Sequence, residues 1–199
     1  MTTTRWTSLS SLVLAALTCA LTLSASGQAE AQTRRSGPVF VSAGVGPFVL
    51  FDVDTSFRLE GQLGWHPGGH DEGFFIAADF SFSIERYYAQ VYGGFRAGAD
   101  LEVFANNDVA VLLTPQGMAG FGFMDFGRGN GGYGFLIFQP SFQVDVALLE
   151  RVLWVWARPV GFDFLLFPDT FRWRAPVQDR GFDWYWGYQF MAGARFNFG

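Results

Sequence analysis

The stretch from Gly181 to Gly199 constrains the fold of this chain more than any other part of its sequence. Its odd positions are small or polar, apart from Met191, and its even positions are apolar: Phe182, Trp184, Trp186, Tyr188, Phe190, Ala192, Ala194, Phe196 and Phe198. A period of two is the pattern of a β-strand with one apolar face, and the run is longer than the usual strand of about 5–6 residues. Aromatic residues gather at both ends of the apolar face, as on strands that cross a bilayer. The stretch therefore predicts a membrane-spanning strand that closes a β-barrel.

The beginning of the chain has the features of a secretory signal peptide. Arg5 precedes an apolar segment over about residues 9–23, and Ala29-Glu30-Ala31 supplies an A-x-A cleavage site. The apolar segment is too short to span a bilayer as a helix. We expect the chain to divide into a cleaved signal peptide that directs Sec export, a short tail and a barrel, at residues 1–31, 32–37 and 38–199.

Composition narrows the classes of site and partner. The chain is 50% hydrophobic and 16% charged, with a net charge of −5 and no basic cluster, which argues against a nucleic-acid surface. Its only cysteine, Cys19, lies inside the apolar segment, where Leu17 and Thr18 fit a lipoprotein signal poorly. The mature chain is therefore expected to contain neither a disulfide nor a cysteine metal site.

Eight alternating runs, separated by turn and loop sequences, follow the tail. They lie within residues 39–51, 57–65, 74–84, 90–103, 109–123, 136–148, 154–164 and 182–198. Arg158 and Pro159 interrupt the seventh run: an arginine on a lipid-facing position costs about 2–4 kcal/mol at the bilayer midplane, and a proline cannot donate to a ladder. We expect a β-bulge that turns Arg158 inward. Pro47, Pro115 and Pro140 also fall inside expected strands.

The apolar face of these runs points to lipid rather than to a soluble core. A lipocalin-like barrel or a β-sandwich also alternates, but an eight-stranded barrel has too little interior space for this much Phe and Trp. The polar face carries far fewer charges than the roughly 25–35% of a soluble surface. The sequence predicts an all-β fold, an eight-stranded antiparallel up-and-down transmembrane β-barrel. The lengths of its connections indicate a periplasmic N-terminus, with the loop at residues 127–132 and the long one at 167–180 outside the cell.

The mature chain resembles the small eight-stranded outer-membrane barrels of the OmpA, OmpX and OmpW type. The resemblance covers the whole mature chain and rests on the pattern of alternation. Its one motif-like part is the last strand, where Phe190, Ala192, Ala194, Phe196 and Phe198 hold the places of the signal read by the barrel-assembly machinery. Gly199 after the last aromatic departs from that pattern. The resemblance implies a bacterial outer-membrane location, contact with lipopolysaccharide and other lipids, delivery by the barrel-assembly machinery through the C-terminal strand, and a monomer.

The inward face is expected to carry charged side chains that pair with one another, because charges in a narrow lumen need partners. The expected members are Arg58, Glu60, Asp79, Arg96, Asp100, Glu102, Asp145 and Arg195. This set fits an ion-pair network that fills and neutralises the barrel. A gate or a solute path is the alternative.

Two further groups of residues are expected at the membrane surfaces. The aromatic girdles should contain Trp65, Trp154, Trp156, Trp184, Trp186, Phe196 and Phe198. In the long connection, Arg172, Trp173 and Arg174 combine cations with an aromatic ring. This group fits an interface belt that reaches lipopolysaccharide phosphates; the alternative is an adhesive or receptor surface.

Catalysis, cofactors and metals find little support in the sequence. His66 and His70 are the only histidines; with Asp71 and Glu72 nearby they are too few for a metal site. Lipid A deacylases on this fold use a histidine and a serine near the outer leaflet, whereas these histidines fall at the periplasmic end, and no GxSxG motif occurs. We expect a non-enzymatic protein without a cofactor, with a structural or surface-interaction role. A channel for small hydrophobic solutes of the OmpW kind is the alternative.

Overall fold

The computed structural model describes residues 37–51, 54–69, 72–84, 88–105, 109–125, 132–149, 151–168, 172–173 and 183–198. Eight long strands are present: β1 (Val39–Leu50), β2 (Asp54–Trp65), β3 (Gly73–Ile84), β4 (Ala89–Ala105), β5 (Ala110–Asp125), β6 (Gly132–Leu148), β7 (Leu153–Phe167) and β9 (Asp183–Phe198). A two-residue strand, β8 (Arg172–Trp173), lies in the connection between β7 and β9. None of the described residues forms a helix long and apolar enough to span a membrane.

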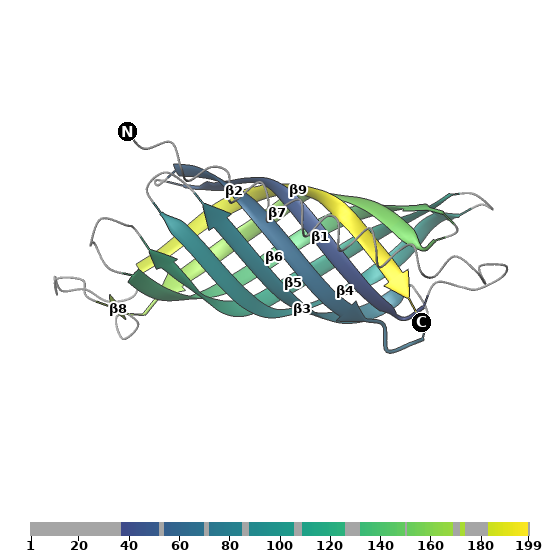
Figure 1. Cartoon of the computed structure of the whole chain (residues 1–199), viewed down its shortest axis with the longest axis horizontal. Helices are drawn as coiled ribbons and strands as arrows, with labels where there is room; N and C mark the ends of the chain where they lie inside the picture. Colours follow the sequence, from purple (N-terminus) through teal and green to yellow (C-terminus); the bar gives the residue numbers. More distant parts are fainter. Residues whose placement is uncertain are drawn as a thin grey trace, which may run out of the picture. The chain divides into compact units, whose positions relative to one another are not determined.

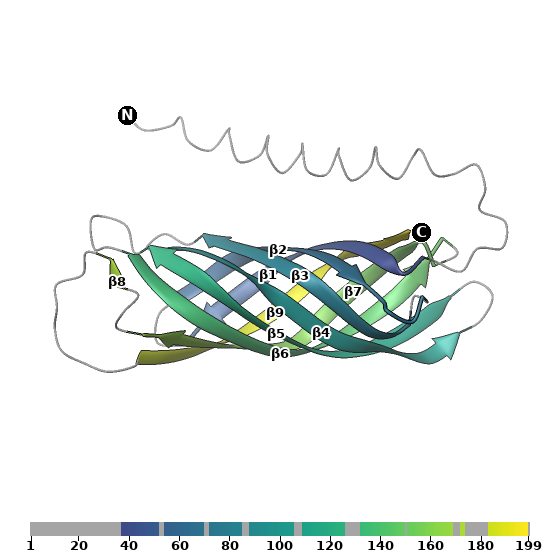
Figure 2. The same ribbon diagram turned by 90° about the horizontal axis from the view of Figure 1, so that it is seen from below.

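The eight long strands form a closed antiparallel up-and-down barrel, as the sequence predicts. Each pairs with its neighbour in the chain, and β9 returns to pair with β1, so that Val39 lies opposite Phe198. The strands tilt around the barrel (Figures 1 and 2), with the dark first strand beside the yellow last one. The end where β1 begins and β9 finishes is called the terminus end here, and the opposite one the loop end. At the loop end β8 adds to β6 through Gly132 and Tyr133.

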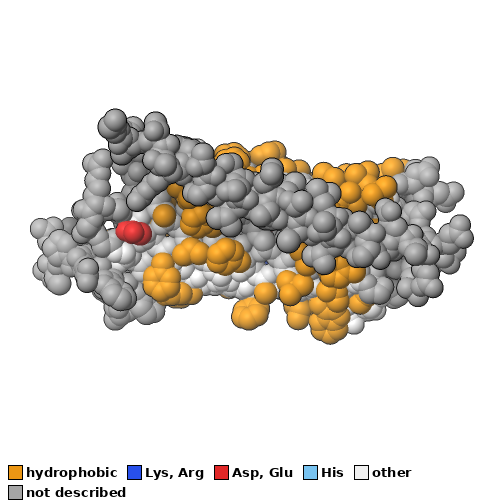
Figure 3. All heavy atoms as spheres, viewed as in Figure 1, with side chains coloured by type: hydrophobic (Ala, Val, Ile, Leu, Met, Phe, Trp, Pro, Cys, Tyr) orange, Lys and Arg blue, Asp and Glu red, His pale blue; other side chains and the backbone are white. Residues whose placement is uncertain are grey.

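Side chains alternate between an apolar outside and a mostly polar lumen. Phe57, Leu63, Phe80 and Phe95 are between 57% and 80% exposed on the outer wall. Figure 3 shows hydrophobic side chains over the visible part of that wall. The residues between them, such as Arg58 and Asp79, are buried inside. A wall that exposes large apolar groups while it buries charged ones is suited to lipid and not to water.

Pro47 and Pro115 each interrupt a single ladder and leave the barrel closed. Beside Pro47 the β1–β9 ladder skips from Val45 to Phe48, whereas the β1–β2 ladder runs through without a gap. Beside Pro115 the β4–β5 ladder skips from Leu113 to Gln116, and the β5–β6 ladder continues. Because proline lacks an N–H, it can lose contact with one neighbouring strand while the other still holds the chain.

The seventh run corrects part of the sequence prediction. One extra residue lies in β7, between Arg158 and Gly161 against β9 and between Ala157 and Val160 against β6, and this bulge places Arg158 in the lumen as expected. Because side chains alternate, one inserted residue also exchanges the inward and outward faces of β7 before the bulge. Trp154 and Trp156, expected in the lipid girdle, are therefore buried inside at 0% and 2% exposure.

The lumen has room for Trp156 because the facing strands carry glycine there. Gly44 of β1 and Gly193 of β9 lie opposite each other, and a Cβ added to Gly44 would stand 2.2 Å from the Trp156 ring. The indole nitrogen of Trp156 donates to Ser42 Oγ over 2.9 Å. Bare backbone on two strands thus admits a large ring from a third.

Candidate functional site

The centre of the lumen holds three arginines and three carboxylates, here called the middle cluster: Arg58, Glu60, Asp79, Arg96, Arg158 and Asp163. All six are at most 4% exposed. They come from β2, β3, β4 and β7, so that their contacts join strands that are not neighbours in the sheet. The cluster is balanced in formal charge, and balance is the condition under which buried charges are tolerated.

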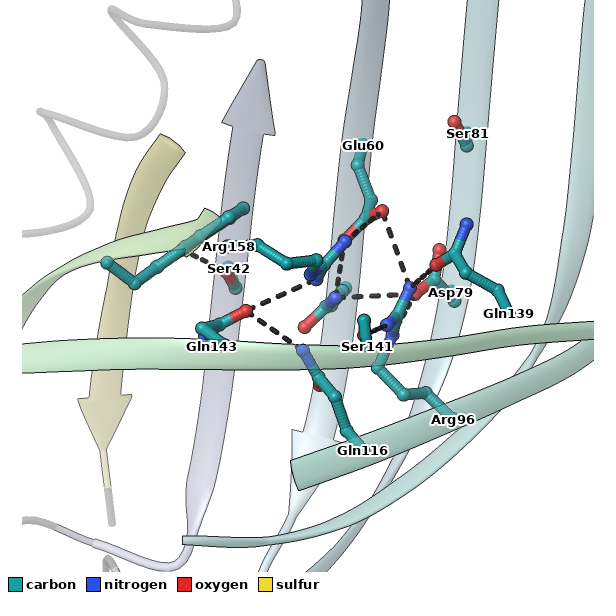
Figure 4. Close-up of polar contacts among 12 residues, drawn as sticks. Ser42, Glu60, Asp79, Ser81, Arg96, Gln116, Gln139, Ser141, Gln143 and Arg158 are labelled. Atoms are coloured by element: carbon teal, nitrogen blue, oxygen red, sulfur yellow. Dashed lines mark hydrogen bonds and ion pairs between the residues drawn. The ribbon is translucent and has the colours of Figure 1, made fainter. Parts of the chain in front are cut away.

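Glu60 of β2 receives two arginines. Arg158 of β7 donates through both terminal nitrogens, over 2.8 Å and 2.7 Å, in a fork that matches the carboxylate. Arg96 of β4 lies 3.4 Å away through Nη2 and donates through Nε to Asp79 over 2.6 Å. Figure 4 shows Arg158 and Arg96 reaching Glu60 from different strands.

Arg58 forms the second bridge across the lumen. It donates to Asp163 of β7 over 2.5 Å and to Gln189 of β9 over 3.1 Å, and its guanidinium lies 3.7 Å from the centre of the Phe48 ring. Gln139 then connects the two bridges, because it accepts from Arg96 over 2.6 Å and donates to Asp163 over 2.8 Å. The middle cluster is one connected network.

A second group of charges lies near the terminus end and is called the end cluster: His66, Asp100, Asp145 and Arg195, with the Thr114 hydroxyl between the acids. Arg195 of β9 donates to Asp100 of β4 over 2.7 Å. These strands are four places apart in the ring of eight, so this contact crosses the full width of the barrel. Thr114 Oγ1 donates to Asp100 over 2.7 Å and lies 3.2 Å from Asp145.

An apolar cluster fills the lumen at the loop end. Its buried members are Phe48, Leu50, Tyr88, Tyr92, Met118, Met124, Phe135, Ile137, Leu165 and Phe167. They come from β1, β4, β5, β6 and β7 or from the residue before β4. From the terminus end to the loop end, the lumen therefore passes from charged to apolar side chains.

Seven of the eight charged residues expected in the lumen are buried there, but Glu102 is not. The expected lumen residues Arg58, Glu60, Asp79, Arg96, Asp100, Asp145 and Arg195 are each at most 4% exposed. The Glu102 side chain is 31% exposed and pairs with Arg151 over 2.8 Å at the terminus end. At this end β4 extends beyond β3, because the last pair of their ladder is Gly73 with Asp100. The register of β4 against β5 also shifts here, between Glu102 and Phe104.

The residues expected at the membrane surfaces divide into three groups. Trp65, Trp184, Trp186 and Phe198 are 40–66% exposed on the outer wall, and Phe196 is partly exposed there. Trp154 and Trp156 are inside, as described above. Arg172 and Trp173 form β8, although their side chains are not described, and Arg174 lies outside the described residues.

Sequence reasoning named neither Asp163 nor His66 as a lumen residue, and it turned Arg158 inward without giving it a partner. Asp163 could have been found from the alternation alone, because it stands between Phe162 and Phe164, which the seventh run already places on its apolar face. His66 had the appearance of a loop residue, yet it is fully buried. His70 and Asp71 lie outside the described residues, and among the residues described no three His, Cys, Asp or Glu side chains are grouped to hold a metal ion.

Comparison with solved structures supports the fold. The chain is similar to the crystal structure of Neisserial surface protein A, with a TM-score of 0.54 and 12% sequence identity over 80% of this chain and 97% of that one. No family model matches the chain, and no curated protein matches its sequence. At this identity the likeness concerns the architecture alone, an eight-stranded antiparallel β-barrel.

Proposed function

We propose that this protein is a non-enzymatic outer-membrane barrel with a filled lumen, whose role is structural or lies in surface interactions. The observation that carries the proposal is the set of ion pairs that cross the lumen, above all Arg195 to Asp100 between opposite strands over 2.7 Å. Any solute would have to break such pairs in both charged clusters. Leaving one partner of a buried pair uncompensated costs about 3–5 kcal/mol, which opposes opening.

The proposal includes how the protein reaches and sits in the membrane. Residues 1–31 act as a Sec signal peptide that is removed, the N-terminus of the barrel faces the periplasm, and the barrel-assembly machinery reads the C-terminal strand. The apolar wall contacts outer-membrane lipids and lipopolysaccharide, and the barrel works as a monomer. Two observations support a closed barrel embedded in lipid: apolar side chains alternate onto its outer wall, and β1 pairs with β9 along its length.

A channel for small hydrophobic solutes is the second candidate, and unpaired polar atoms in the lumen favour it. Among the described residues, Ser56 Oγ, Arg58 Nη2 and both amide atoms of Gln90 are buried without a hydrogen-bond partner. Ser56 and Arg58 lie on β2, and Gln90 pairs with Ser83, which in turn pairs with Arg58. A polar strip on this wall, next to the apolar cluster, is where a solute path would run.

Single-channel recording in planar bilayers tests the two candidates. The filled-lumen proposal predicts that the refolded protein, checked for its folded form by a heat-dependent gel shift, adds no steady conductance. A reproducible conductance that changes in Arg96→Ala would overturn it and favour the channel.

A further inference from the structure

His66 occupies an unusual position for a residue in a turn sequence. It directly follows β2, and its side chain is fully buried. The ring packs against both Phe40 of β1 and Phe75 of β3, with centroid separations of 5.3 Å and 5.8 Å, and these two rings also contact each other. The imidazole is therefore sealed into the terminus end of the lumen.

Both ring nitrogens of His66 face oxygen atoms that accept hydrogen bonds. Nε2 lies 3.0 Å from Asp100 Oδ2, and Nδ1 lies 3.3 Å from the Pro38 carbonyl oxygen, which also accepts from the His66 backbone N–H over 2.8 Å. A neutral imidazole has one N–H and one bare nitrogen, so it can satisfy only one of these contacts. An imidazolium donates to both.

The oxygens of Asp100 have the surroundings of an ionised carboxylate. Arg195 Nη1 donates to Oδ2 over 2.7 Å, and the Thr114 hydroxyl donates to Oδ1 over 2.7 Å. A carboxylate that accepts from a guanidinium and a hydroxyl can also accept a charged hydrogen bond from His66.

The charges of the lumen give an independent argument. Among the buried side chains described there, four arginines accompany five carboxyl groups. The middle cluster is balanced, so the excess negative charge belongs to the end cluster, where Asp100 and Asp145 share Arg195. A proton on His66 brings the end cluster, and with it the lumen, to neutrality, which buried charge requires.

We propose that His66 is a proton-binding site that latches the terminus end of the barrel. With two protons the ring ties the segment before β1, at Pro38, to Asp100 on β4, and through Asp100 to Arg195 on β9. Loss of one proton leaves a bare nitrogen against an oxygen and restores the excess negative charge, so the latch weakens as pH rises.

The groups that face this site come from every strand around it. Asp100 contacts the His66 ring, and Arg195 pairs with Asp100. Thr114 of β5 and Asp145 of β6 contact these two residues and not the ring. From β1 and β3 the ring meets only Phe40 and Phe75 among these contacts, and both are uncharged. The expected pH response therefore depends on His66 together with the two carboxyl groups and Arg195.

The protonation state is measured directly by ¹⁵N NMR of histidine-labelled protein in detergent micelles. The His70→Gln variant leaves His66 as the one histidine of the chain. At pH 7 we expect both ring nitrogens to give the signal of an imidazolium. A spectrum with one protonated and one bare nitrogen would overturn the proposal, even if variants at His66 fail to fold.

The latch is tested by urea unfolding between pH 5.5 and pH 8.5, the range around the ordinary titration of histidine. Wild type and the His70→Gln control should both lose resistance to urea as pH rises, with a falling midpoint. In His66→Gln, whose amide carries no titrating proton, the fall should be largely absent. Equal pH dependence in His66→Gln and the control would contradict the latch.

Discussion

The middle cluster and the end cluster keep charge inside the same barrel by different means. In the middle cluster, three arginines face three carboxylates, and the fork from Arg158 to Glu60 spans 2.8 Å and 2.7 Å. In the end cluster, Arg195 faces Asp100 and Asp145, and the second cation is His66. Arginine stays charged under all ordinary conditions, whereas histidine changes charge near neutral pH. The cations at the centre of the lumen thus keep their charge as pH changes, whereas His66 at the terminus end is the one cation of the two clusters that can lose it.

The largest effect is expected from Glu60→Gln, which breaks the middle cluster. The change leaves Arg158 and Arg96 buried without their shared carboxylate, and should lower the free energy of unfolding by about 3–5 kcal/mol. Urea unfolding of the refolded protein in phospholipid vesicles measures it.

The matched control for that change is Glu102→Gln. The side chains of Glu102 and Arg151 are 31–32% exposed, so we expect this variant to lose only about 0.2–1 kcal/mol of the free energy of unfolding. Equal losses in the two variants would show that burial does not distinguish the middle cluster from the terminus-end surface.

A smaller effect is expected where Trp156 lies beside the middle cluster, 5.2 Å from the Arg158 guanidinium. Gly44→Ala places a methyl group 2.2 Å from the ring and should cost about 1–3 kcal/mol by overpacking. Gly61→Ala is the control, because a Cβ there meets nothing within 4 Å. A Gly44→Ala variant as stable as Gly61→Ala, by the same unfolding measurement, would argue that Trp156 is not held in the lumen.

Hydroxyl deletions compare the two clusters more finely. Thr114→Val keeps the shape but removes the hydroxyl that lies between Asp100 and Asp145, and should cost about 1–3 kcal/mol. Ser83→Ala removes an acceptor for Arg58 Nε at 3.2 Å in the middle cluster and should cost about 0.5–1.5 kcal/mol, since Arg58 keeps Asp163. If Ser83→Ala lowered the free energy of unfolding more than Thr114→Val, the middle cluster would depend on its hydroxyl group more than the end cluster does.

The sequence predicted the eight strands and most lumen residues because alternation is a local signal. It assigned Trp154 and Trp156 to lipid because one bulge exchanges the faces of everything before it, and the extent of that exchange depends on pairing with β6 and β9. The Arg158–Pro159 pair located the bulge in the sequence. Because side chains alternate, the same bulge also turns Trp154 and Trp156 inward, and the sequence prediction did not extend the exchange of faces to these two residues.

Contacts across the lumen were beyond the reach of the sequence. Nothing in the alternation around Glu102 distinguishes it from Asp100, yet one lies at the open end of the barrel and the other pairs with Arg195. His66 follows a strand and precedes Pro and Gly, which is the signature of a loop. Pairing of β1 with β2 brings Pro38 to its ring, and the stagger of β2, β3 and β4 brings Asp100 there. Such contacts depend on the stagger of strands four places apart.

A double-mutant cycle between Arg195 and Asp100 tests most directly whether ion pairs across the lumen hold the barrel filled. The free energy of unfolding is measured at pH 6 for wild type, Arg195→Met, Asp100→Asn and the double variant. A filled lumen predicts a coupling energy of about 1–3 kcal/mol, well above that of the exposed pair Glu102 and Arg151 measured in the same way. Additive losses, with a coupling no larger than that of the exposed pair, would contradict the account.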